Sequence, residues 1–133
     1  MINFIKKYLG NIYIPLLWTL IIIILLTLPG QMLPSEQKFS IPQFDKIVHI
    51  CMFGGFVFLW NLYLSRRYTA VKKLLGLFFF IFILGEALGI GMEFVQKYFI
   101  PNRDFDLADM IADMIGAGIA YGLSTILLLT DRA

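Results

Sequence analysis

The stretch LLGLFFFIFILGEALGIGMEFVQKYF, residues 74–99, decides the fold class of this chain. Apolar residues surround the whole circumference of a helix here, interrupted in the second half by Glu86, Glu93 and Gln96. A helix needs about 20 mostly apolar residues to cross a bilayer, and a continuous apolar run favours a helix over the alternating pattern of a barrel strand. We therefore predict that residues 74–99 form a transmembrane helix.

Three further stretches continue the same pattern along the chain. We predict that residues 11–29, 46–64 and 106–130 also form membrane-spanning helices. The composition agrees, because 59% of the residues are hydrophobic and only 15% are charged, whereas soluble domains contain about 25% charged residues. The sequence therefore predicts an all-α, polytopic bundle of four transmembrane helices, in a single domain that covers residues 1–133.

The distribution of basic residues predicts the orientation of the bundle. One side of the predicted membrane carries more of them, and the positive-inside rule assigns that side to the cytoplasm. It holds Lys6, Lys7, Arg66, Arg67, Lys72, Lys73 and Arg132, against Lys38, Lys46, Lys97 and Arg103 on the other side. We therefore expect a multi-pass protein of the cytoplasmic (inner) membrane with both termini in the cytoplasm, and we interpret the basic residues of 66–73 as topology signals.

The same residues exclude or disfavour simpler classes of protein. The net charge is only +2 and the basic residues lie in pairs beside apolar segments, so nucleic acid is excluded as a partner. A cleaved signal peptide at residues 11–29 is disfavoured, because its apolar run exceeds the usual length of about 7–15 residues. The single cysteine, Cys51, rules out an intramolecular disulfide.

Polar residues gather at the predicted outer end of the bundle. Helix 46–64 begins there, helix 74–99 ends there and helix 106–130 begins there, and each carries a polar stripe. The stripes consist of Asp45, Lys46 and His49, of Glu93 and Gln96, and of Asp106, Asp109 and Asp113. Helical angles place each set on one face, and a charge at the helix centre in lipid costs at least about 2.5–3.5 kcal/mol. We therefore expect the stripes to turn inward and form a polar pocket.

Some of these acids have a structural explanation as well. Asp104 and Asp106 lie where a helix N-terminus favours a carboxylate cap, and Asp45 has the same position at the start of its helix. Asp113 and Glu93 lie too deep to act as caps. For these two we favour a functional role.

Arg103, His49 and Glu86 complete the predicted pocket. The short connection after residue 99 is expected to fold Arg103 back over the acids as their counter-ion. His49 is either a satisfied interior histidine or a functional group opposite these acids. Glu86, near the middle of its helix, is predicted to be protonated and hydrogen-bonded. The glycines are interpreted as close-packing surfaces between helices: Gly54 and Gly55, Gly85 and Gly89, Gly118 and Gly122.

Two segments carry a resemblance to a known family. DKIVHICMFGGFVF, residues 45–58, opens one helix with Lys-x-x-His, and GEALGIGMEFVQKYFIPNRDFDLADMIADMIGAGIA, residues 85–120, joins Glu-x-x-Gln to a turn with arginine and then to a helix with aspartate and glycine. In this order the chain resembles the VanZ-like family of small integral membrane proteins over about residues 12–128. The matching positions are Lys46, His49, Glu93, Gln96, Arg103, Asp109 and Gly116, whereas Asp113 stands where the family often has asparagine.

The resemblance implies a bacterial cell-envelope protein. The family is named for a protein linked to resistance against the glycopeptide teicoplanin, and many of its members have no link to resistance. Of the functions that fit the residues, we prefer a non-enzymatic protein with an outward-facing acidic pocket. This pocket would bind an envelope lipid headgroup, a lipid-linked precursor, or a cationic or amphiphilic ligand such as a glycopeptide. Its predicted lining is His49, Glu93, Gln96, Arg103, Asp109 and Asp113, supported by Asp45, Lys46, Glu86 and Asp106.

The alternative function is a metal-assisted membrane enzyme that acts on a lipid-linked headgroup. The candidate ligands His49, Glu93, Asp109 and Asp113 combine one nitrogen with several oxygens, which suits Zn²⁺ or, without the histidine, Mg²⁺. Arg103 would hold a phosphate beside the ion. The spacing matches no established catalytic motif, and apart from a divalent metal no cofactor is predicted. A homo-oligomer is left open, and a proton-coupled transporter would require one.

Overall fold

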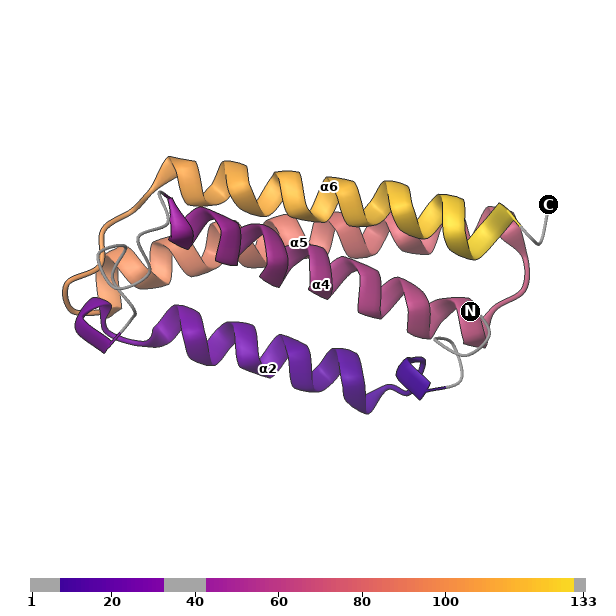
Figure 1. Ribbon diagram of the computed structural model, residues 1–133, viewed down its shortest axis with the longest axis horizontal. Coiled ribbons are helices and arrows are strands. Elements are labelled where there is room, and N and C mark those ends of the chain that lie inside the picture. The colour runs from indigo at the N-terminus through magenta and orange to yellow at the C-terminus, as the bar shows by residue number, and fades with distance from the viewer. Residues whose placement is uncertain (1–7, 33–42, 131–133) are drawn as a thin grey trace.

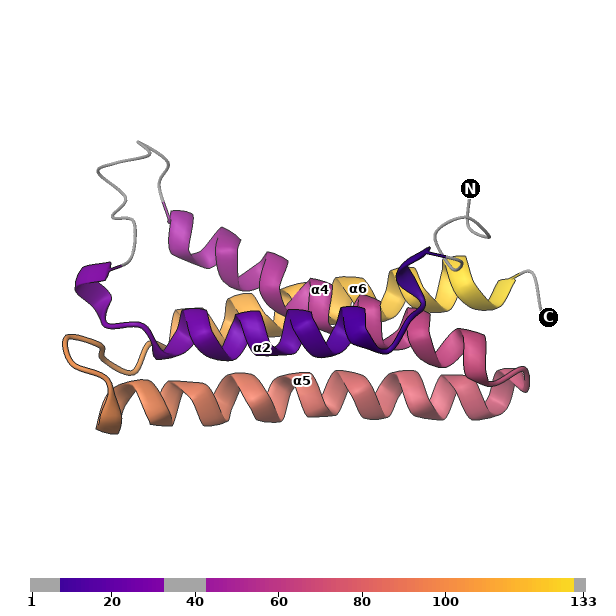
Figure 2. The same ribbon diagram turned by 90° about the horizontal axis from the view of Figure 1, so that it is seen from below.

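Four α-helices account for most of the residues that the computed structural model describes, which are residues 8–32 and 43–130 (Figure 1). The elements are α2 (Tyr13–Thr27), the short 3-10 helix η1 (Gly30–Met32), α4 (Phe44–Arg67), α5 (Val71–Phe99) and α6 (Leu107–Leu129). Figures 1 and 2 show α4 and α6 running in the same direction, with α2 and α5 running in the opposite one. The prediction of an all-helical chain is confirmed for this described part.

Three of the helices have the length and apolar composition to cross a membrane. They are α4, α5 and α6, and their bounds lie within three residues of the predicted ones. These helices indicate a multi-pass membrane protein. The orientation of the termini and the boundary of a single domain stay predictions.

The first helix is shorter than we predicted from residues 11–29. Its helical part has 15 residues, and at 1.5 Å per residue it falls short of a hydrocarbon core of about 30 Å. Leu28, with ψ of 138°, already has extended backbone, because the residue before a proline, here Pro29, avoids helical geometry. Among the described helices α2 is therefore not of spanning length, and a fourth span stays a prediction.

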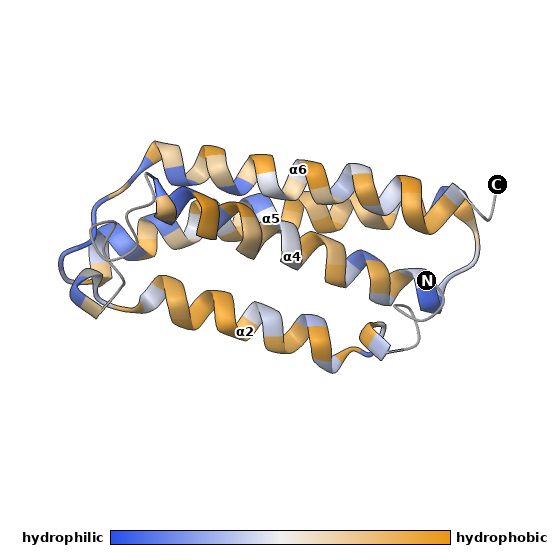
Figure 3. Cartoon of the chain, viewed as in Figure 1, coloured by the Kyte–Doolittle hydropathy of each residue, from blue (hydrophilic) through white to orange (hydrophobic). Residues whose placement is uncertain are grey.

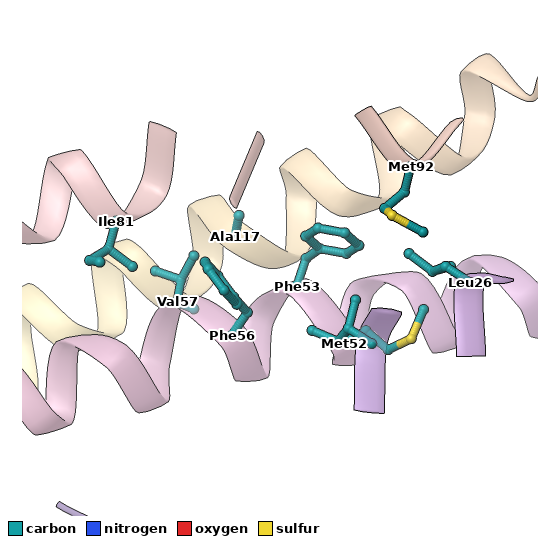
Figure 4. Packing of buried hydrophobic residues seen from close by; sticks show 10 residues of the cluster. Leu26, Met52, Phe53, Phe56, Val57, Ile81, Met92 and Ala117 are labelled. Atoms are coloured by element: carbon teal, nitrogen blue, oxygen red, sulfur yellow. The ribbon is translucent and has the colours of Figure 1, made fainter. Parts of the chain in front are cut away.

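A tightly packed apolar centre joins the four helices (Figure 4). Phe53 and Val57 of α4 are completely buried and pack with Ile81 of α5, Ala117 of α6 and Leu26 of α2. Figure 3 shows hydrophobic residues over most of each helix and hydrophilic ones gathered toward the ends. Large apolar side chains also cover the outside of the bundle, as expected for a surface in contact with lipid tails.

Glycines bring α4 and α6 into direct backbone contact. A Cβ added to Gly116 would overlap the backbone of Ile50, and one added to Gly54 would lie 3.2 Å from the carbonyl oxygen of Gly116. Close approach of this kind is how small residues join helices in membranes. We predicted that Gly118 and Gly122 pack in the same way. A Cβ added to either of them would have no other atom within 4 Å, so that prediction was wrong.

Side-chain hydrogen bonds dock α2 onto the rest of the bundle. The indole N–H of Trp18 donates to the carbonyl oxygen of Met52 at 2.9 Å, and that of Trp60 donates to the hydroxyl of Thr19 at 3.1 Å. The amide of Gln96 donates to the carbonyl oxygen of Leu26 at 3.0 Å, near the end of α2. These contacts fix α2 against α4 and α5, and the one with Gln96 lies toward the end of the bundle at which the polar stripes meet.

Candidate functional site

Lys46, in the first turn of α4, connects three carboxylates at one end of the bundle. Its Nζ lies 2.8 Å from Asp45, 2.5 Å from Asp106 and 2.5 Å from Asp109. Three N–H donors on one ammonium match three acceptors, so Lys46 is the counter-ion of this group. We had predicted that role for Arg103, which forms no ion pair within the part of the chain that the structure describes. That prediction was wrong.

The start of α6 is held by two carboxylates. Oδ1 of Asp106 accepts from the backbone N–H of Ala108 at 2.8 Å, which is the predicted cap. The backbone N–H of Asp106 in turn donates to Oε2 of Glu93 at 2.9 Å, tying the end of α5 to the start of α6. The hydrogen bond from Lys46 holds the pKa of Asp106 below its ordinary value of 3.8. Glu93 keeps further lone pairs on both carboxylate oxygens, which can accept from or coordinate a ligand.

Two of the predicted caps do not form. Gln43 precedes α4 in the left-handed backbone region, without a side-chain cap, and Asp45 pairs with Lys46 inside the first turn. Asp104 is exposed and the cap of α6 is Asp106. The sequence allowed either Asp104 or Asp106 to cap α6. Asp106 is the cap because it directly precedes Leu107, the first residue of the helix.

His49 is buried between α4 and α6. Its Nδ1 lies 2.8 Å from Oδ1 of Asp113, and its ring stacks on Phe53 at 6.5 Å between centroids. Only 4% of His49 and 2% of Asp113 are exposed. The other ring nitrogen, Nε2, faces Oδ2 of Asp109 at 3.6 Å. Asp113 thus fixes the ring, and Nε2 points into the acidic group.

The environment of Nε2 favours a positive charge when Nδ1 donates to Asp113. When Nδ1 donates to the Asp113 carboxylate, a neutral ring presents a lone pair at Nε2. That lone pair would face the Asp109 carboxylate at a distance too long for a hydrogen bond. A proton on Nε2, or a cation between the two atoms, removes the repulsion. A carboxylate behind a histidine is also the usual support of a metal-binding imidazole.

One combination of these side chains has the spacing of a metal site. Donor atoms of His49, Glu93 and Asp109, all buried, lie within 4.8 Å of one another. In a tetrahedral site with metal–ligand distances near 2.1 Å, the ligand atoms are about 3.4 Å apart, close to the 3.6 Å observed between Nε2 and Oδ2. A second combination, Asp45, Asp106 and Asp109, surrounds the ammonium of Lys46 instead. The buried combination therefore fits a divalent cation better.

A cavity of about 270 Å³ reaches His49 from the side of α2. Arg103, in the connection between α5 and α6, also lines it, and its Nε is buried without a hydrogen-bond partner. The remaining walls are almost entirely apolar: Leu25, Leu26, Phe44, Val48 and Met52, with Asp45 at the edge. We did not predict these apolar walls, because nothing in a uniformly apolar helix marks which face adjoins a pocket.

Gln96 and Glu86 lie outside this arrangement. Gln96 is buried, and the hydrogen bond that its amide donates joins α5 to α2. Glu86 lines a separate cavity of about 200 Å³ between α5 and α6, which Asp113 and Gly89 also border. Its Oε1 is buried without a partner, as is Oδ2 of Asp113. Asp113 thus borders this cavity and contacts His49, which lines the other one.

This chain has relatives among known families and curated sequences. A family model described as VanZ/LLP1 matches residues 3–128. The chain is also similar to the "Uncharacterized protein C11E3.10" of Schizosaccharomyces pombe, with 33% identity over 107 residues. The matching region is 79% of this chain but 61% of the relative, so the chain spans less than two thirds of that protein. No solved structure matches.

Proposed function

The chain belongs to the VanZ/LLP1 family, and from this premise we propose that its polar pocket binds the phosphate-bearing headgroup of a membrane lipid. The observation that carries the proposal is the buried, unpartnered Nε of Arg103 in a cavity with apolar walls. A guanidinium recognises phosphate through charge-assisted hydrogen bonds. The apolar side chains of α2 and α4 offer the adjoining surface to the lipid chain.

The pairing of the acids leaves a basic group, rather than a carboxylate, for a ligand in the cavity. Lys46 pairs with three of the acids, and Asp113 is engaged by His49. The charged group that remains for a ligand on the cavity side is therefore Arg103. Its guanidinium carries the positive charge that attracts an anion.

A binding assay with a matched pair of amphiphiles tests this proposal. Purified protein in detergent micelles is titrated with farnesyl phosphate and with farnesol, and the bound fraction is read by native mass spectrometry. We expect the phosphate to bind at least tenfold more tightly than the alcohol, and Arg103→Gln to remove that preference. Lys97→Gln, which removes a basic residue near the same end, serves as the control. Equal binding of both amphiphiles to the unchanged protein would refute the proposal.

A second candidate function adds hydrolysis of the bound headgroup. The observation that favours it is Nε2 of His49, supported by Asp113 and facing Asp109 and Glu93 at metal-site spacing. These residues would hold a divalent cation, which supplies charge neutralisation at the phosphate and lowers the pKa of water. In the reaction, the oxygen of water bonds to phosphorus, the bond from phosphorus to the leaving oxygen breaks, and that oxygen takes up a proton. Arg103 would hold the phosphate in place.

Metal content and phosphate release test the second function separately. Elemental analysis of purified protein should find one divalent ion per chain, and Glu93→Gln should reduce this at least tenfold. Asp104→Asn, an exposed carboxylate nearby, should change nothing. Release of phosphate from farnesyl diphosphate should stop after chelation and resume with added metal. Metal-free protein with no phosphate release under any metal would remove this function and leave headgroup binding intact.

The occurrence of a relative in Schizosaccharomyces pombe supports a lipid ligand over a glycopeptide. Glycopeptides act on peptidoglycan precursors, which a yeast does not make, whereas phosphorylated lipids occur in both kinds of cell. We keep an effect on teicoplanin susceptibility, and location in a bacterial inner membrane, as proposals. An unchanged inhibitory concentration of teicoplanin after deletion of the chain in its host would exclude the first of these.

A further inference from the structure

A third cavity lies at the end of the bundle opposite to His49. Figures 1 and 2 both show that α2 begins at the end where α4 finishes. Between them lies a volume of about 400 Å³, bordered by Tyr63 and Arg67 near the end of α4 and by Asn11 just before α2. It shares no residue with the cavity that reaches His49. Its chemistry therefore requires a separate explanation.

The lining of this cavity is basic and aromatic. Arg66 and Arg67 contribute two guanidinium groups, Tyr8 and Tyr63 contribute two phenols, and none of the lining residues that the structure describes is acidic. Nε of Arg67 donates to the hydroxyl of Tyr63 at 3.4 Å, and its guanidinium lies 5.7 Å from the centre of that ring. Tyr63 thus holds Arg67 against the wall of the cavity. The carboxylates grouped around Lys46 are at the other end of the bundle.

The backbone at this cavity also favours an anion. The N-terminus of α2 borders it, and an N-terminus carries the positive end of the helix dipole. No acidic residue in the first turn of α2 neutralises that end. Tyrosine and arginine at the end of a spanning helix belong to the headgroup layer of a membrane, where basic pockets between helices bind anionic lipid headgroups.

We propose that the cavity formed by Arg66, Arg67, Tyr63 and the start of α2 binds the phosphate of an anionic phospholipid. The bundle then holds two phosphate-recognising sites, one at each end. The arginines, which the sequence suggested only as topology signals, also act as ligands. This site stands apart from the proposed function, because it needs neither Arg103 nor the metal cluster.

Lipid retention by paired charge variants tests this site. Full-length protein is titrated with dioleoyl phosphatidylglycerol and, separately, with dioleoyl phosphatidylcholine, and retained lipid is counted by native mass spectrometry. We expect a preference for phosphatidylglycerol that the double change Arg66→Gln and Arg67→Gln reduces about 30-fold, from the usual contribution of two basic residues. The control is Lys72→Gln with Lys73→Gln, which removes the same charge from exposed neighbours outside the cavity.

Further measurements test whether the bound phosphate belongs to a lipid and whether the variants remain folded. Millimolar inorganic phosphate should displace little phosphatidylglycerol; full displacement would overturn the assignment to a lipid. Tyr63→Phe keeps the ring and removes the hydroxyl that holds Arg67, so it should weaken retention by a smaller factor with unchanged circular dichroism. The loss caused by the double arginine change should be equally large in an Arg103→Gln background, because the two cavities share no residue. An equal loss in the arginine and lysine double variants, or no loss in either, would refute the site.

Discussion

Replacement of Gly116 by alanine should push α4 and α6 apart. A Cβ at position 116 would lie 2.8 Å from the Cα of Ile50 and closer still to its carbonyl oxygen. Ordinary van der Waals contact begins at 3.4 Å, and helical backbone cannot turn aside as a side chain can. The helices must therefore separate locally by at least about 0.6 Å, the difference between 3.4 and 2.8 Å.

This displacement should affect both stability and the candidate site. Overpacking costs about 1–3 kcal/mol, and alanine returns up to about 1 kcal/mol through its helix propensity. The two contributions leave a net loss of about 0–3 kcal/mol, and contact with backbone rather than with a side chain favours the upper part of that range. Transmitted in full, the movement would lengthen the 2.8 Å contact between His49 and Asp113 to about 3.4 Å, outside the normal range of a hydrogen bond.

Thermal unfolding in detergent, followed by circular dichroism, measures the first effect, and retention of a divalent ion measures the second. The control is Gly118→Ala on the same helix, where nothing lies within 4 Å of the added Cβ. That variant should be as stable as the unchanged protein or slightly more stable, and should retain the same ligands. Equal melting temperatures of the two variants would refute the packing argument.

Three further predictions concern the polar end and the docking of α2. Lys46→Met should lower stability by about 1–3 kcal/mol in chemical unfolding, because three carboxylates lose their ammonium in a partly exposed setting. Because the pKa of Asp106 is lowered, its stabilising contribution is complete above about pH 3.8 and is lost as the pH falls through the lower pKa of the folded state. The difference in melting temperature between the unchanged protein and Asp106→Asn should therefore shrink below pH 3.8. Trp18→Phe should cost about 1 kcal/mol, the value of one hydrogen bond, and should increase proteolysis before Tyr13.

Much of the fold followed from local sequence pattern. Helical periodicity and depth along each helix placed His49, Asp109 and Asp113 on inward faces at one end, and the structure buries all three. Such an inference works because a charged residue in a spanning helix has few alternatives to the interior. The shortening of α2 was also readable in principle, since Pro29 marks the residue before it as non-helical.

The parts that sequence could not provide depend on distances between elements. Lys46 and Arg103 were equally able to neutralise the acids, and the choice between them depended on the path of the connection through Asn102, which has a positive φ of 58°. The helix face that carries Gly116 rather than Gly118 became the contact surface only through the crossing of α4 and α6. Neither choice leaves a signal in one sequence.

The charge balance of the polar end bears directly on its function. Five carboxylates, those of Asp45, Glu93, Asp106, Asp109 and Asp113, surround one lysine and one histidine in the described structure. If all were ionised, even a doubly protonated His49 would leave an excess of negative charge at the edge of a low-dielectric interior, which is costly without a counter-ion. A phosphate held by Arg103 beside these acids would raise that cost. Binding of the anion and occupation of the buried His49 cluster by a cation should therefore favour each other, and by linkage the coupling must be the same in both directions.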